Sequence, residues 1–119
     1  MSTTETLDWI YSRTEPTGAQ MAPAMYRFIA DKLEADPALL QIGLDNIARW
    51  LAQGHDAVKW FGQWRALILE AQASPAGLKK LLDLMRDESW EAMYFKEFEP
   101  FCGVMTPEER RQFLCSSAH

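Results

Sequence analysis

The sequence predicts an all-α fold, a compact bundle of about five to seven short helices. Three pairs of residues have the chemistry of helix starts: Asp36–Pro37, Ser74–Pro75 and Thr106–Pro107. In each pair the first side chain can accept a hydrogen bond from an unpaired N–H group of the first turn, and the fixed φ angle of proline suits the first helical position. Glu109 follows Thr106 at the spacing of a capping box. No segment shows the alternation of apolar and polar residues that is typical of strands.

The N-terminal part of the chain is expected to hold two helices separated by a loop. Residues 4–11 are expected to form a short helix, and 12–18 a loop because they are rich in turn-forming residues. A longer helix is expected over 20–35, with Pro23 in its first turn, where proline is tolerated. Its apolar residues recur at three- and four-residue spacing: Met21, Met25, Phe28, Ile29 and Leu33.

The middle of the chain predicts the core of the bundle, two helices over 37–53 and 57–72. Gly54 marks the end of the first, and Asp56 is the expected cap of the second. Because the link is short, the two helices are expected to be antiparallel neighbours. Gly43, inside the first helix, costs about 1 kcal/mol relative to alanine and indicates close approach of a neighbouring backbone. The apolar stripes are Leu40, Leu44, Ile47 and Leu51 on the first helix and Trp60, Trp64, Leu67 and Ala71 on the second.

Three further helices are expected in the C-terminal half. They span 75–86, 90–97 and 107–114. A mostly apolar connector over 100–105 joins the last two helices, and the tail, 115–119, is expected to be mobile.

Length and composition favour one helical domain over the whole chain, 1–119. A second domain would have too little core, and a hydrophobic fraction of 48% with 12% aromatic residues is enough to fill one core. The formal net charge is −5. This balance argues against direct binding to nucleic acid, which relies on Lys and Arg to neutralise phosphates, and it favours a partner with a basic surface.

The sequence also predicts a cytoplasmic protein that does not enter a membrane. The first residues, MSTTETLDW, lack the basic and apolar regions of a signal peptide. No stretch approaches the roughly 20 apolar residues of a membrane span. Two cysteines do not make a disulfide framework.

Histidine and cysteine form no recognisable site in the sequence. His55 and His119 have no carboxylate or thiol at a metal-ligand spacing, and His55 is expected to be a solvated loop residue. Cys102 is expected to be a small core residue, and Cys115 lies near a helix end. Neither thiol has an assignable histidine to activate it. We therefore predict no metal, no cofactor and no disulfide between the two cysteines.

Two pairs of carboxylates are the remaining candidates for catalysis. Glu108 and Glu109 belong to a first helical turn, where acids favour the helix dipole. Glu88 and Glu91 have the pattern of a solvated face, although paired acids can perform acid–base chemistry when burial separates their pKa values. No catalytic residue is predicted. The alternative is a small enzyme with a site built from Glu88, Glu91 and Tyr94.

The aromatic residues between 90 and 101 are the best candidate for a binding surface. They are spread around the expected helix and are not confined to one face, so the helix is either enclosed in the core or partly exposed for a partner. The pair Trp60 and Trp64, at helical spacing on one stripe, is instead expected to be core. The expected partner-binding residues are Trp90, Glu91, Tyr94, Glu97, Phe98 and Glu99.

Two stretches resemble small uncharacterised bacterial helical proteins that are loosely associated with gene pairs of the toxin–antitoxin kind. They are EPFCGVMTPEER, over 99–110, and DPALLQIGLDNIARWLAQG, over 36–54. The resemblance implies a bacterial or phage interaction protein and supplies no catalytic residues.

The sequence as a whole favours a non-catalytic module that binds another protein. An antitoxin-like, neutralising or regulatory role is its most concrete form. The alternatives are the small enzyme with a carboxylate-based site and a self-associating structural subunit, such as a homodimer.

Overall fold

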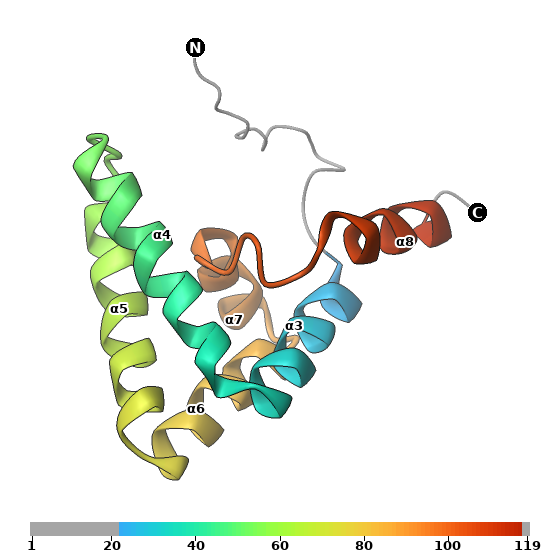
Figure 1. Cartoon of the computed structure of the whole chain (residues 1–119), viewed down its shortest axis with the longest axis horizontal. Coiled ribbons are helices and arrows are strands. Elements are labelled where there is room, and N and C mark those ends of the chain that lie inside the picture. Colours follow the sequence, from blue (N-terminus) through green and yellow to red (C-terminus); the bar gives the residue numbers. More distant parts are fainter. Residues whose placement is uncertain (1–21, 118–119) are drawn as a thin grey trace.

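The computed structural model describes residues 22–117, and within them the chain is all-α, with six α-helices and no strand (Figure 1). The bundle expected from the sequence is therefore confirmed. The helix expected over 4–11 and the loop over 12–18 lie outside the described residues. The helices are α3 (Pro23–Ala35), α4 (Leu40–Ala52), α5 (Val58–Ala73), α6 (Pro75–Arg86), α7 (Trp90–Phe95) and α8 (Pro107–Ser117), with single 3₁₀ turns η1 (Pro37–Leu39) and η2 (Lys96–Phe98).

The helix starts follow the capping chemistry of the sequence. The Ser74 hydroxyl accepts from the N–H of Gly77 at 3.0 Å and begins α6. The Thr106 hydroxyl accepts from the Glu109 N–H at 3.1 Å, and the Glu109 carboxylate accepts from the Thr106 N–H at 2.8 Å, so the expected capping box is confirmed. Asp36 accepts from the N–H of Ala38, which gives the 3₁₀ turn η1 before α4 in place of one continuous helix.

Glycine serves two different purposes in this bundle. Gly54 has φ +84°, a left-handed conformation that ends the α4 segment as expected. Gly43 is tightly packed, but its neighbours are side chains and not the backbone that we expected. A Cβ there would lie 2.8 Å from the Phe101 ring and 2.9 Å from Ile68.

The helices α4 and α5 form the expected antiparallel hairpin and lie side by side (Figure 1). Ile47 of α4 and Trp64 of α5 are buried, and α6 packs on α5 and α3. Leu51, expected on the core stripe, is 36% exposed and lies in the last turn of α4, next to the loop that joins α4 to α5. Trp60 is only half-buried.

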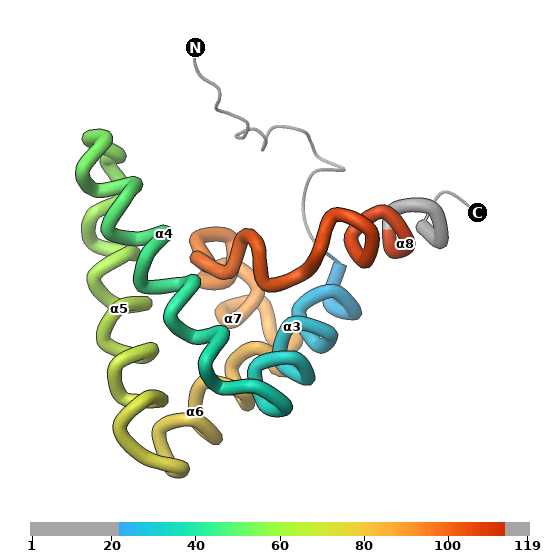
Figure 2. The backbone as a smooth tube through the Cα atoms, viewed as in Figure 1, coloured from blue at the N-terminus to red at the C-terminus, as the bar shows by residue number. Residues whose placement is uncertain are grey.

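The connector between η2 and α8 runs from the side of α7 to that of α3 (Figure 2). Asn46, which is buried in α4, fixes it by donating through Nδ2 to the carbonyl oxygens of Pro100 at 2.7 Å and Cys102 at 2.8 Å. At its far end Lys32 of α3 pairs with Glu109 of α8 at 2.7 Å.

We predict that Ile47→Ala lowers the free energy of unfolding by about 2–5 kcal/mol, because it removes buried methyl groups and leaves a cavity. Leu51→Ala, one turn later on α4, is the matched control and should cost at most about 1 kcal/mol because Leu51 is partly exposed. Urea denaturation followed by circular dichroism measures both values. Equal losses for the two variants would contradict the assignment of the core.

Candidate protein-binding surface

Four aromatic side chains from α5, α7 and η2 form a connected patch, which we call the aromatic face: Trp60, Trp90, Tyr94 and Phe98. Trp90 stacks on Tyr94 with ring centroids 5.7 Å apart, and Trp60 stacks on Phe98 at 4.8 Å. Tyr94 joins the two pairs through edge contacts with Trp60 and Phe98. Trp90 is 76% exposed and Tyr94 43% exposed, whereas Trp60 and Phe98 are half-buried.

The rest of the aromatic segment belongs to the core. Phe95 stacks on Trp64 with ring centroids 4.7 Å apart, and the Trp64 indole N–H donates to the Phe95 carbonyl oxygen at 3.3 Å. Phe101 is buried and meets Trp64 edge-on. The segment between 90 and 101 is thus neither wholly enclosed nor wholly a surface: Phe95 and Phe101 fix it, and Trp90 and Tyr94 remain outside.

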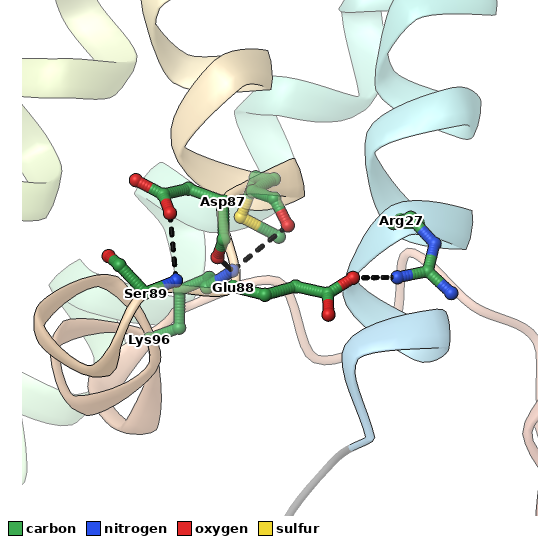
Figure 3. A network of polar contacts seen from close by, with 6 residues as sticks. Arg27, Asp87, Glu88, Ser89 and Lys96 are labelled. Carbon is green, nitrogen blue, oxygen red and sulfur yellow. Dashed lines mark hydrogen bonds and ion pairs between the residues drawn. The ribbon is translucent and has the colours of Figure 1, made fainter.

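A buried lysine holds the inner side of this segment. The Lys96 ammonium donates to the carbonyl oxygens of Met85 at 3.0 Å and Asp87 at 2.6 Å, at the end of α6 (Figure 3). It lies 4.9 Å from the Tyr26 ring centroid, and the Tyr26 hydroxyl donates to the Lys96 carbonyl oxygen at 3.1 Å. Burial lowers the pKa of Lys96, while the negative charges of Asp87 and Glu88 oppose that shift.

Sequence reasoning missed the role of Lys96, because a lone lysine in an acidic neighbourhood is typical of a solvated face. One signal was present. Ala92 and Lys96 are one helical turn apart, on the side opposite Trp90 and Tyr94, and both are buried.

Two exposed acids beside Lys96 join α7 to its neighbours (Figure 3). Glu88 pairs with Arg27 of α3. The Asp87 carboxylate accepts from the Ser89 N–H at 2.8 Å, and this hydrogen bond is the main reason that the pKa of Asp87 is lowered. The Ser89 hydroxyl caps α7 through the Ala92 N–H at 3.2 Å.

The three acids that we expected around the aromatic face differ in environment. Glu91 and Glu97 are exposed, and neither forms an ion pair within the described residues. Glu99 is half-buried, and its carboxylate accepts from the Phe101 N–H at 2.8 Å. Burial raises the pKa of Glu99 to about 7, against the opposing effects of that N–H group and of Arg110.

The other candidates from the sequence lie apart from this surface. No group of three His, Cys, Asp or Glu residues could hold a metal ion within the part of the chain that the structure describes. His55 is an exposed loop residue as expected, and its Nδ1 accepts from the Ala57 N–H at 3.1 Å. The expected Asp56 cap is wrong, because α5 begins after Ala57 with no side-chain hydrogen bond to its first turn. His119 lies outside the described residues.

Cys102 is exposed, so its expected place in the core is wrong. Its backbone carbonyl is held inward by Asn46, which leaves the side chain outside. The Cys115 side chain lies outside the described residues. Within those residues, no helix is both long and apolar enough to cross a membrane.

Comparison of the chain with protein-family models, with curated proteins and with solved structures finds no match. The similarity to proteins of toxin–antitoxin gene pairs therefore stays a prediction.

We predict that Glu99 makes the protein less stable as pH rises. Its pKa is about 7 in the folded chain and near 4.5 when the side chain is solvated. The folded state therefore binds more protons between these values, so stability falls as the pH rises through that window and stays lower above it. Glu99→Gln keeps an oxygen for the Phe101 N–H and cannot ionise.

The free energy of unfolding of Glu99→Gln, relative to the native chain, should therefore increase from pH 4.5 to pH 7.5. Urea denaturation at several pH values gives this difference, and effects of other groups cancel in it. A difference that does not change with pH would show that Glu99 ionises as freely in the folded state as in the unfolded state.

Proposed function

We propose that this chain is a non-catalytic protein-binding module that engages its partner through the aromatic face. The observation that carries the proposal is the exposed, stacked pair Trp90 and Tyr94, supported from beneath by core contacts of the same short helix. Tryptophan and tyrosine are the residues that most often dominate binding energy at protein interfaces.

Rigidity strengthens this interpretation. A side chain that is already held by stacking loses little conformational freedom when a partner covers it. Trp60 and Phe98 both contact Tyr94 edge to face, and Tyr94 in turn stacks on Trp90. The aromatic face is therefore preorganised, in contrast to a lone exposed tryptophan.

The charge of the chain favours a partner with a basic surface and disfavours direct contact with nucleic acid. The net charge is −5, and Glu91 and Glu97 lie on the segment that carries Trp90 and Tyr94. Exposed acids beside an interface accelerate association with a basic partner, and salt weakens the effect. An antitoxin-like, neutralising or regulatory role in the cytoplasm of a bacterial cell fits such a module.

Self-association is the second candidate, because a homodimer would also bury an exposed aromatic face. The carboxylate-based enzyme has weaker support. Glu88 pairs with Arg27, and both side chains are about half exposed, so this acid is engaged in an ion pair that joins α3 to the start of α7.

The proposal predicts that a photoreactive benzoylphenylalanine in place of Tyr94 crosslinks to a different protein in cells of the source organism. The product should decrease when Trp90→Ala is added. The same group in place of Leu69, which is 39% exposed on α5, is the matched control and should give no product.

Two results would contradict this proposal. A product of twice the chain mass from position 94 would favour the self-associating subunit. No product from position 94, or equal products from positions 94 and 69, would remove the aromatic face as a binding surface.

A further inference from the structure

The chain repeatedly places a cation on an aromatic ring. Lys59 lies 5.8 Å from the Trp60 ring centroid and Arg49 lies 5.9 Å from that of Trp50. Trp64 is enclosed in the core. Trp90 is therefore the one tryptophan among residues 22–117 that is largely exposed and has no cation on its ring.

The geometry of Trp90 leaves one face of its indole ring open. Its other face is stacked on Tyr94, with 11° between the ring planes. The indole N–H of Trp90 has no acceptor within the described residues. A partner group can therefore stack on the ring and still leave the N–H group available for a second contact.

The charges near Trp90 are negative. Asp87 precedes the helix, and its carboxylate is held in the ionised form by the Ser89 N–H. Glu91 follows Trp90 directly, and Glu97 lies on η2. The nearby cation Arg27 is engaged with Glu88, and Lys96 is buried. Lys59 is at the other end of the aromatic face, on Trp60.

These negative charges indicate which class of partner can bind the aromatic face. In a two-fold homodimer the same patch meets itself, so Glu91 and Glu97 would approach their own copies, which costs affinity. An anionic lipid surface would be repelled for the same reason. A cationic protein segment can place a positive charge on the open face of Trp90 and is attracted by the neighbouring acids.

We propose that the partner presents a basic segment with an arginine that stacks on the open face of Trp90, while the exposed acids Glu91 and Glu97 attract the positive charge of that segment, an inference that rests on the proposed protein-binding function. Arginine fits better than lysine because its guanidinium is planar, stacks on aromatic rings and offers five N–H donors to carboxylates. The compact ammonium group of lysine cannot make both contacts as well.

Selection from a random 12-residue peptide display library tests this inference on the full chain. The library is first depleted on the Trp90→Ala protein and then selected on the native protein. Since Trp90 is exposed, the variant should fold, and circular dichroism verifies this. We expect the recovered peptides to be enriched in arginine over lysine.

The recovered peptides are then synthesised with arginine replaced by the neutral isostere citrulline, and their affinities are measured by fluorescence anisotropy. The loss should be roughly three- to tenfold on the native protein. It should be much smaller on Glu91→Gln/Glu97→Gln. The control Glu108→Gln, an exposed acid in the first turn of α8, should behave as the native protein does.

The outcomes separate this inference from the proposed function. Peptides that require Trp90 but lack arginine, or that bind equally well after citrulline replacement, would overturn the arginine inference and leave protein binding supported. A selection that yields no peptide dependent on Trp90 would contradict both.

Discussion

The buried ammonium group of Lys96 fixes the position of α7 and η2, and thereby determines which aromatic side chains of this segment are exposed. Lys96 carries its charge into a site where only 1% of the residue is exposed. Such burial is costly unless the charge is compensated. Here the compensation comes from the carbonyl oxygens of Met85 and Asp87, at the negative end of the α6 dipole, and from the electron-rich face of Tyr26. One side chain thereby joins α3, α6 and the segment formed by α7 and η2.

The exposed aromatic pair is a consequence of that constraint. The helix α7 has only six residues and would not be stable alone. Lys96 and Ala92 fix its inner side, and the stack of Phe95 on Trp64 fixes its flank. The remaining side must then face outward, and it carries Trp90 and Tyr94. The same packing that places Phe95 against the core therefore leaves Trp90 and Tyr94 exposed.

Local chemistry was sufficient to predict the helices, but the site depends on contacts between distant segments. Ser74 and Thr106 determine helix starts through atoms within three residues, so their roles follow from the sequence. The burial of the Lys96 side chain depends on where α6 ends. The burial of Glu99 depends on how the connector packs. Neither environment can be read from the residues next to Lys96 or Glu99 in the sequence. Cys102 was misplaced for the same reason, since a buried asparagine of α4 decides which way its backbone faces.

Amide hydrogen exchange of Lys96→Met tests most directly whether the buried ammonium holds α7 in place. Methionine preserves the apolar stem but leaves two carbonyl oxygens without their donor, so protection of the Met93 amide, which donates to the Ser89 carbonyl, should fall by roughly tenfold or more. Protection of the Ile68 amide in the buried core of α5 should fall less. The account would be contradicted if Met93 kept its protection, or if Met93 and Ile68 lost protection in equal measure.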